Sequence, residues 1–573
     1  MSRSKHRITS TWRRRLVLGL FTVSALTLVA RAGYLQLIDR EFLQTQGEAR
    51  HIRSVQVPAN RGMLLDRNGE ALAASAPVDS VWAEPMILLA DPAGLARLAG
   101  ALGATVPELE RRLRGREDRQ FVYLKRHVSP KVAYAVKLLG VPGVNLRREY
   151  HRYYPTAEVT GQLLGYTNID DEGQEGLELA YDDWLRGRPG AKRVLRDRFG
   201  RTIKDVASIR VPQPGRDVVL SIDRRIQYLA YRQLKAAVLQ HKAKSAAAVV
   251  LDVRTGEILA MVSQPAGNPN RGSDRRAALQ RNRVVTDVFE PGSTFKPLAV
   301  AAALESGKVS SRSQIDTSPG ELRVGGQTVR DVRDFGVLDV SGVLRKSSNV
   351  GVSKLALALP DDALWSLYQR LGFGVSVGLG FPGEAPGHLS HYSEWNRFER
   401  ATHAFGYGVS VSVLHLARAY AALAADGVMY PASLLRVEHP GPGQRVLSVD
   451  TARAVRTMLE AVVGPDGTAQ RAQVSAYRVA GKTGTARKNA RDGGYEDDRF
   501  LAMFAGMAPA SNPRLVMAVM IDDPRGEEYY GGQVAAPVFS QVMSGALRLM
   551  NVPPDDLPEE LDLMRVADRS ERL

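Results

Sequence analysis

With 573 residues, a formal net charge of +16 and no cysteine, the chain is predicted to fold as two or more domains. A hydrophobic share of 44% and a charged share of 24% exclude an intrinsically disordered chain, and a single long apolar run excludes a polytopic membrane protein. The absence of cysteine excludes disulfides and thiolate metal sites. The basic residues are scattered and form no nucleic-acid-binding motif, so nucleic acid is not a predicted partner.

The amino end predicts a membrane anchor. Basic residues and no acidic one precede an apolar run over residues 16–38, which would measure roughly 34 Å as a helix and can cross a hydrocarbon core of about 30 Å. Ala30-Arg31-Ala32 also resembles a signal-peptidase site. Because apolar residues continue beyond it and Tyr34 falls near the outer interface, we expect an uncleaved anchor, with the tail 1–15 in the cytoplasm.

Residues 39–215 are rich in arginine and turns and are predicted to form an elongated, mixed α/β unit without a catalytic cluster. A turn is expected between Asp66 and Gly69. A Pro/Gly break at 211–215 then predicts a domain boundary.

The second predicted domain covers residues 216–552. It begins with a strand at 217–222 and a helix at 225–240, followed by strands at 246–252 and 257–262 that a turn at 254–256 joins. The remaining residues, 553–573, are predicted to be an acidic, loosely held tail.

A possible nucleophile and base lie at the start of a predicted helix. Pro291-Gly292 precedes an apolar segment over 294–304, which places Ser293 at the amino end of that helix. Lys296 lies three residues later and shares the same helical face. An amine can take the proton of a serine hydroxyl if burial or a nearby cation lowers its pKa from about 10.4 to roughly 7 or 8. Alone, this S-x-x-K pair is weak evidence, because Ser2 and Lys5 repeat the pattern in the predicted tail.

Two later motifs strengthen this interpretation. Ser347-Ser348-Asn349 and Lys482-Thr483-Gly484-Thr485 follow in the order and spacing of the S-x-x-K, S-x-N and K-T-G set of serine β-lactamases and penicillin-binding proteins. Each motif alone could be a turn, a cap or a strand end, but the ordered set predicts one active site.

The residue types fit acyl transfer to or from a peptide. We expect Asn349 to bind an amide carbonyl and Ser347 to pass a proton to the leaving nitrogen. Lys482, Thr483 and Thr485 offer a cation and hydroxyls to a carboxylate, and Gly484 leaves room for an extended peptide at a strand edge. The backbone N–H groups of Ser293 and Thr485 are the predicted oxyanion hole.

On these motifs the chain resembles the class B penicillin-binding proteins, specifically the division-type (septal) peptidoglycan D,D-transpeptidases of Gram-negative bacteria. The resemblance extends over the anchor and over these segments: 61–69, 282–293, 347–351, 405–408, 482–486 and 529–539. Ser348 replaces the aspartate that class A β-lactamases carry between the serine and the asparagine, which is usual in class B proteins.

The resemblance implies a transpeptidase domain with a five-stranded antiparallel sheet flanked by helices, and a non-catalytic, dimerisation-type pedestal domain. Ser293 would form an acyl-enzyme with the penultimate D-Ala of a stem pentapeptide, the donor, and an amine of a neighbouring stem peptide would accept the acyl group. β-Lactams would acylate the same serine. Tyr407, Tyr529, Tyr530 and Gly531 are expected to form walls of the substrate cleft. No cofactor or metal is expected.

The implied location is the bacterial inner membrane, with a single span, a cytoplasmic amino end and a periplasmic catalytic domain. The implied partners are membrane-anchored division proteins and a membrane glycan polymerase. An elongation-type class B transpeptidase, a β-lactamase, and a non-catalytic β-lactam sensor or scaffold are the alternatives, of which the first shares the chemistry.

Overall fold

The computed structural model describes residues 11–40, 52–196, 202–489 and 494–557. The chain forms two compact units, a first unit of residues 1–60, 77–150 and 188–214 and a second unit of residues 61–76, 151–187 and 215–573. The second unit begins its last segment at the predicted boundary, but it also contains two earlier segments, so the domain limits 39–215 and 216–552 stay a prediction. The first ten residues and the tail from residue 558 lie outside the described residues.

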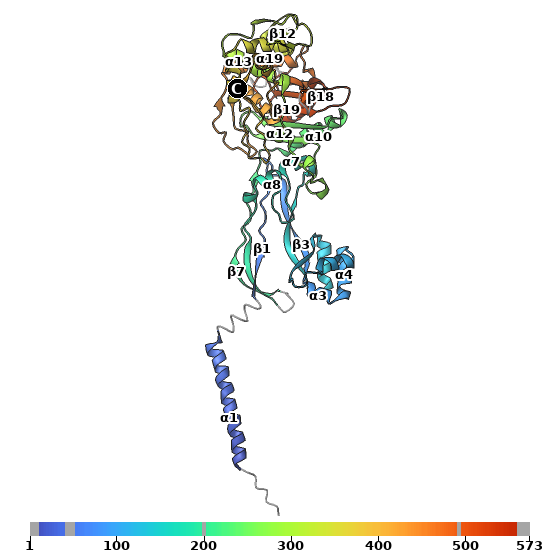
Figure 1. Ribbon diagram of the computed structural model, residues 1–573, viewed down its shortest axis with the longest axis vertical. Coiled ribbons are helices and arrows are strands. Elements are labelled where there is room, and N and C mark those ends of the chain that lie inside the picture. The colour runs from blue at the N-terminus through green and yellow to red at the C-terminus, as the bar shows by residue number, and fades with distance from the viewer. Residues whose placement is uncertain (1–10, 41–51, 197–201, 490–493, 558–573) are drawn as a thin grey trace, which may run out of the picture. The chain divides into compact units, whose positions relative to one another are not determined.

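A long apolar helix lies near the amino end. Helix α1 (Thr11–Gly33) continues as a π-helical turn over Tyr34–Ile38, and Figure 1 draws α1 in dark blue. The segment Trp12–Ile38 has 27 residues and a mean hydropathy of 1.8, which makes it long and apolar enough to cross a membrane. It covers the predicted span 16–38.

The first unit contains a three-stranded antiparallel sheet, in the order β1-β6-β7, and strand β4, which pairs with β3; β5 also pairs with β3, and both β3 and β5 extend into the second unit. Helices α3 to α6 supply leucines such as Leu95, Leu98 and Leu109 to a separate apolar core. The elements are β1 (Ile52–Val57), β3 (Ala71–Ala83), α3 (Pro85–Leu89), α4 (Pro92–Leu102), α5 (Val106–Leu113), β4 (Val122–Val128), α6 (Pro130–Leu139), β5 (Val144–Tyr153), β6 (Gly190–Arg196) and β7 (Thr202–Arg210).

A buried ionic cluster ties together the early segments of the second unit. The carboxylate of Glu178 accepts hydrogen bonds from Arg61 Nε at 2.8 Å and Arg152 Nε at 2.7 Å, and all three side chains are almost fully buried. The predicted turn is present, since Gly69 N donates to Asp66 O at 3.0 Å and Gly69 has a φ of +86°. The cluster connects these two early segments to each other, and hydrogen bonds such as that from Arg67 N to Ile222 O, at 2.9 Å, connect them to the rest of the second unit.

Replacing Glu178 with alanine is expected to lower the free energy of unfolding by about 3–5 kcal/mol, because it leaves the buried guanidinium group of Arg152 without its carboxylate and that of Arg61 with Asp182 alone. Thermal unfolding of the full-length protein, followed by circular dichroism, measures the effect. Glu528→Ala is the control, since its pair with Arg471 is partly exposed and is expected to contribute about 0–1 kcal/mol. Equal shifts in Tm for both variants would contradict a stabilising role of the buried cluster.

The centre of the second unit is a five-stranded antiparallel sheet in the order β10-β9-β19-β18-β17, so the predicted sheet is confirmed. Its strands are β9 (Ser245–Asp252), β10 (Ile258–Gln264), β17 (Ala480–Asn489), β18 (Tyr495–Ala508) and β19 (Leu515–Asp522). The predicted helix at 225–240 is present as α10 (Arg224–Gln240). The order of the strands makes β17, which carries the third motif, an edge strand.

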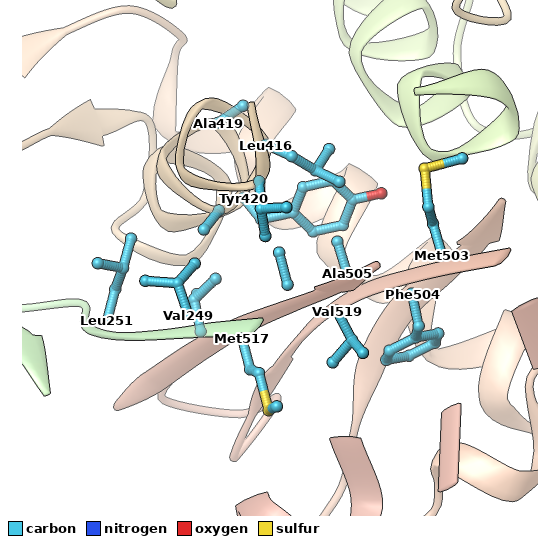
Figure 2. Close-up of a cluster of buried hydrophobic side chains, with 14 of the residues drawn as sticks. Val249, Leu251, Leu416, Ala419, Tyr420, Met503, Phe504, Ala505, Met517 and Val519 are labelled. Carbon is cyan, nitrogen blue, oxygen red and sulfur yellow. The ribbon is translucent and has the colours of Figure 1, made fainter. Parts of the chain in front are cut away.

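Both faces of this sheet are covered by helices. Figure 2 shows Val249 and Ala505 on the face beneath Leu416 and Tyr420 of α18 (Val413–Ala424), whereas Phe504 points to the opposite face. There the ring of Phe504 lies 4.7 Å from that of Phe539 in α21 (Ala536–Leu549). Since directly paired residues share a face and Lys482 pairs with Ala505, the side chain of Lys482 lies on the α18 face.

The remaining helices and strands of the second unit surround this sheet. Its other helices are α7 (Gly161–Leu164), α8 (Gly176–Ala180), α9 (Asp182–Leu185), α11 (Ala277–Gln280), α12 (Arg283–Thr286), α13 (Lys296–Glu305), α14 (Val340–Arg345), α15 (Asn349–Leu357), α16 (Ala363–Arg370), α17 (Arg397–His403), α19 (Val449–Val463) and α20 (Gly531–Val534). Its short strands are β2 (Leu64–Leu65), β8 (Val218–Val219), β11 (Gln314–Asp316), β12 (Glu321–Val324), β13 (Gln327–Arg330), β14 (Val337–Asp339), β15 (Val428–Met429) and β16 (Gln444–Arg445).

Candidate active site

Ser293 lies in a 3-10 turn, Gly292–Phe295, that leads directly into α13. The helix therefore begins two residues later than the predicted segment 294–304, and Lys296 is its first residue. The ring of Phe295 is fully buried and holds the turn in the core. Tyr420 of α18 donates a hydrogen bond to the carbonyl of Thr294 at 2.8 Å, which fixes the backbone next to Ser293.

Strand β17 packs directly against this turn. A Cβ placed on Gly484 would lie 2.9 Å from Thr294 Cγ2 and 3.1 Å from the carbonyl oxygen of Pro291. A Cβ on Gly292 would lie 3.4 Å from the Cβ of Ala486. Gly484 is thus a position of close approach between the first and third motifs, a reason for glycine that the sequence pattern alone did not supply.

The second motif is the tight connection between α14 and α15. Ser347 has a φ of +59°, a left-handed conformation that costs a serine about 1–2 kcal/mol. Ser348 caps α15, and its Oγ accepts a hydrogen bond from Gly351 N at 2.8 Å. Such strained backbone is found where the surrounding structure fixes a functional side chain.

The amines of two lysines converge on Ser347. Lys296 Nζ donates to the Oγ of Ser347 at 3.1 Å and to its carbonyl oxygen at 2.5 Å. Lys482 Nζ donates to the same Oγ at 3.0 Å and to the carbonyl of Thr483 at 3.1 Å. One hydroxyl therefore bridges the first and third motifs, and the three predicted motifs meet at a single site.

Burial controls the charge of both lysines, whose side chains have no solvent exposure. Burial lowers the pKa of Lys482 to about 7. Burial also lowers the pKa of Lys296 well below the ordinary lysine value, the neighbouring cation of Lys482 lowers it further, and the carboxylate of Asp331 acts in the opposite direction.

Asp331 is a member of the site that the sequence analysis missed. Its Oδ2 accepts from the hydroxyl of Ser348 at 2.5 Å, and its Oδ1 accepts from the backbone N–H groups of Asn349 and Val350, the latter at 3.1 Å. A carboxylate that directly follows β13 thus holds the connection that presents Ser347. Nothing in the local sequence around Asp331 indicates this, because its partners lie some 17 to 19 residues away.

The other polar residues of the motifs lie around this centre. Asn349 is the first residue of α15 and donates to the carbonyl of Arg330 at 2.9 Å. Thr483 Oγ1 lies 3.5 Å from Lys482 Nζ and 3.0 Å from the hydroxyl of Thr468, a residue that the sequence analysis did not select. Thr485 Oγ1 accepts a hydrogen bond from Gly531 N at 3.0 Å, so two predicted binding residues are in contact.

Aromatic residues lie next to the motifs on two sides. On one side, Gly406 packs against the Ser293 turn, because a Cβ there would lie 2.5 Å from Gly292 O. The ring of the adjacent Tyr407 lies 5.4 Å from that of Tyr495. On the other side, beside Gly531, the rings of Tyr529 and Tyr530 are stacked at 4.4 Å.

Glu290 is a further residue of this region. It lies within the segment 282–293, and the sequence analysis gave it no role. Its Oε1 accepts hydrogen bonds from Gly408 N at 2.8 Å and from the hydroxyl of Tyr495 at 3.3 Å. Burial raises the pKa of Glu290. The side chain therefore connects the segment before Ser293 with the Phe405–Gly408 segment and with the start of β18.

Two family models match the chain. The penicillin-binding protein transpeptidase domain matches residues 246–544, and the penicillin-binding protein dimerisation domain matches residues 56–220. Together with the five-stranded sheet and the meeting of the three motifs, these matches define the class. The chain belongs to the class B penicillin-binding proteins.

Relatives cover nearly the whole chain. It is 44% identical over 553 residues to the peptidoglycan D,D-transpeptidase FtsI of Escherichia coli, covering 96% of this chain and 93% of that protein. It is 44% identical to the probable peptidoglycan D,D-transpeptidase PbpC of Pseudomonas aeruginosa, covering 97% of each.

Solved structures show the same folds. The transpeptidase domain of penicillin-binding protein 3 from Burkholderia pseudomallei is 45% identical, with a TM-score of 0.55 over 59% of this chain and 98% of that one. Penicillin-binding protein 3 from Mycobacterium tuberculosis, solved with aztreonam, is 28% identical, with a TM-score of 0.68 over 87% of this chain and 98% of that one.

Proposed function

We propose that this protein is a serine D,D-transpeptidase that cross-links the stem peptides of peptidoglycan during cell division, through an acyl-enzyme on Ser293, and that β-lactams acylate the same serine. The observation that carries the proposal is the pair of buried lysines that share the hydroxyl of Ser347 beside the Ser293 turn. The names of the relatives in Escherichia coli and Pseudomonas aeruginosa support the same activity and substrate.

The hydrogen bonds around the two amines favour one distribution of protons. A charged lysine has three N–H donors, and Lys482 has three acceptors nearby, namely Ser347 Oγ and the carbonyl and hydroxyl of Thr483. A neutral lysine has two donors and a lone pair, and Lys296 has two acceptors in Ser347. We therefore place the proton on Lys482, which leaves the lone pair of Lys296 available to a neighbouring hydroxyl.

In the acylation step, Lys296 Nζ would take the proton of the Ser293 hydroxyl while Ser293 Oγ attacks the carbonyl carbon of the penultimate D-Ala. The developing oxyanion would accept hydrogen bonds from the backbone N–H groups of Ser293 and Thr485. Ser347 Oγ accepts two hydrogen bonds from the lysines, so its own proton is free to pass to the leaving nitrogen, and Lys296 replaces that proton. Terminal D-Ala then leaves as a free amine.

In the second step, the amine of a neighbouring stem peptide would attack the ester carbon and give its proton through Lys296 back to Ser293 Oγ. A new amide bond forms, and the serine is restored. The edge strand β17 offers backbone groups to an extended peptide. Lys482, with Thr483 and Thr485, would attract the donor carboxylate, Asn349 would bind its amide, and Tyr407, Tyr529 and Tyr530 would line the cleft.

For the location, we propose that α1 crosses the bacterial inner membrane once. Arg13, Arg14 and Arg15 lie at its start, and the positive-inside rule places this end in the cytoplasm and the catalytic unit in the periplasm. Membrane-anchored division proteins and a membrane glycan polymerase are the partners that this placement and the family suggest.

Incubation of the full-length protein in detergent with a fluorescent penicillin, and separately with a D-Ala thioester donor and an acceptor amine, tests the activity. We expect a stable covalent label that mass spectrometry places on Ser293, together with transfer of the acyl group to the amine. Labelling without transfer would instead indicate a sensor, and rapid release of hydrolysed penicillin would indicate a β-lactamase.

Asp331→Asn is expected to slow acylation about tenfold. Asparagine keeps one oxygen for the N–H groups of Asn349 and Val350, but it loses the charge-assisted hydrogen bond from the hydroxyl of Ser348. It should also move the acid limb of the pH–rate profile to lower pH. The carboxylate raises the pKa of Lys296, so its removal lets Lys296 remain neutral to lower pH.

Acylation by the fluorescent penicillin, measured from pH 5 to pH 9, gives both quantities. Asp334→Asn is the matched control, since Asp334 is exposed and lies three residues further along. A slower rate with an unmoved acid limb would restrict Asp331 to holding the backbone, without an electrostatic effect on Lys296.

A further inference from the structure

A cavity with an excess of positively charged residues lies in the second unit. It has a volume of ≈370 Å³ and is bordered by the β9–β10 turn, the end of α18, helix α19 and the loop after β18. Three arginines, Arg254, Arg453 and Arg456, line it together with one carboxylate, that of Asp426. None of its lining residues belongs to the three catalytic motifs.

Asp426 neutralises only part of this charge. Its Oδ2 accepts from Arg453 Nε at 3.1 Å and Nη2 at 2.7 Å, and its Oδ1 accepts from Arg456 Nη1 at 2.9 Å. These hydrogen bonds hold the pKa of Asp426 below its usual value. The side chain of Arg254 has no hydrogen bond or ion pair within the described part of the chain. Among the residues that line the cavity, three cations and one carboxylate leave two positive charges, while Asp450, one turn before Arg453 on α19, acts on Arg453 from outside the lining.

Two of the three arginines lie on a helix and are held by hydrogen bonds. Arg456 is 9% exposed and lies one turn after Arg453 on α19, so both side chains face the same way. Asp426 has a φ of +50°, the left-handed conformation that is common just after the end of a helix and that aspartate can adopt, and it follows the last residues of α18. Binding therefore requires little further ordering of Arg453 and Arg456, whereas the exposed side chain of Arg254 has to be ordered by the ligand.

A smaller cavity adjoins the first, since Val253 and Tyr430 line both. It contributes Arg418, whose Nε is buried without a hydrogen-bond partner among the described residues and whose pKa burial lowers. Asp252 also lines this cavity, but it pairs with Arg514 at 2.7 Å. Arg418 therefore adds a guanidinium group next to the first cavity, on which the carboxylate of Glu384 acts as a counter-charge.

We propose that the Arg254–Arg453–Arg456 cavity binds a phosphate group. Guanidinium groups bind phosphate through paired N–H donors, and a phosphate monoester carries close to two negative charges at neutral pH, which matches the two uncompensated positive charges. A carboxylate ligand, with a single negative charge, would neutralise only one of these two positive charges. The amide of Asn512 at the rim adds a neutral donor.

Calorimetric titration of the full-length protein in non-ionic detergent at constant ionic strength tests the proposal. The probes are inorganic diphosphate, glycerol 3-phosphate, glycerophosphoglycerol and acetate. We expect saturable binding of the phosphate probes, with acetate at least tenfold weaker. Tight binding of glycerol 3-phosphate, a monoester with close to two negative charges, supports the charge match, and tighter binding of glycerophosphoglycerol, a phosphodiester with a single charge, would overturn it.

Arg254→Gln and Arg453→Gln are each expected to weaken phosphate binding about tenfold, since each removes a charged donor. Arg471→Gln, an exposed arginine outside the cavity, is the control and should bind phosphate like the unaltered protein. All three variants should keep the rate of acylation by penicillin. Absence of saturable binding, acetate binding as tight as that of phosphate, or equal weakening by Arg471→Gln would overturn the proposal.

Discussion

Replacing Ser293 with alanine is expected to abolish covalent labelling by fluorescent penicillin and transfer from the thioester donor. Without the Oγ there is no nucleophile for either acyl donor, and the neighbouring lysine amine lies buried against Ser347. The fold should be unaffected. The hydroxyl of Ser293 has no hydrogen-bond partner within the described residues, so the free energy of unfolding should change by less than about 0.5 kcal/mol.

Labelling is measured by in-gel fluorescence and by mass spectrometry of the labelled peptide, and stability by thermal unfolding. Ser310→Ala, an exposed serine beyond α13, is the matched control and should label like the unaltered protein. A label that persists in the Ser293→Ala protein would place the nucleophile elsewhere and would remove the basis of the proposed function. Loss of the label together with a large fall in Tm would not separate catalysis from folding, so Ser293→Cys is measured in parallel and should restore slow labelling.

The sequence was sufficient to predict the parts of the site that consist of local patterns. Ser293 and Lys296 lie on one helical turn, Ser347 lies in a tight connection, and Lys482 lies on a strand, and each of these could be inferred from the residues beside it. That the three positions meet could be expected only from their order and from the family resemblance. The central sheet could likewise be predicted only from the family resemblance, since its order, β10-β9-β19-β18-β17, pairs strands more than 200 residues apart.

The parts that escaped prediction depend on contacts between distant residues. Asp331 follows a short hairpin strand, and only the folded chain brings its carboxylate to Ser348. Glu290 stands three residues before the nucleophile, but its partner Tyr495 is 205 residues away. A periodic pattern reports which face of an element is buried, and it does not report which polar group will be its partner.

The second unit combines chain segments from both sides of the predicted boundary, and this too depends on contacts between distant residues. Its early segments, 61–76 and 151–187, carry Arg61, Arg152 and Glu178, which form a buried ionic cluster across more than 100 residues. Composition and Pro/Gly breaks favour a single boundary near residue 215. They cannot show that segments before that boundary belong to the second unit, because the contacts that group these segments form between distant residues only in the folded chain.

Replacing Lys296 with methionine is expected to slow acylation of Ser293 by about 10²–10⁴-fold, the usual contribution of a positioned general base. Methionine keeps the unbranched, buried shape of the side chain and replaces the basic amine with a thioether that cannot take up a proton. Acylation by penicillin and transfer from the thioester should fall together, because both need the proton of the Ser293 hydroxyl to be removed. Lys308→Ala, an exposed lysine after α13, is the control, and an unchanged rate in Lys296→Met would exclude Lys296 as the base.

The pH dependence separates the two lysines. Lys296 is a base only when it is neutral, so the acylation rate of the unaltered protein should fall as the pH drops through the folded-state pKa of Lys296. The cation of Lys482 lowers that pKa. Lys482→Gln removes the cation, the pKa of Lys296 rises, and the acid limb should move to higher pH, opposite to the shift expected for Asp331→Asn. Burial is the larger cause of the low pKa of Lys296, and the cation of Lys482 lowers it further. An acid limb that stays in place in Lys482→Gln would therefore show that burial alone sets the charge of Lys296.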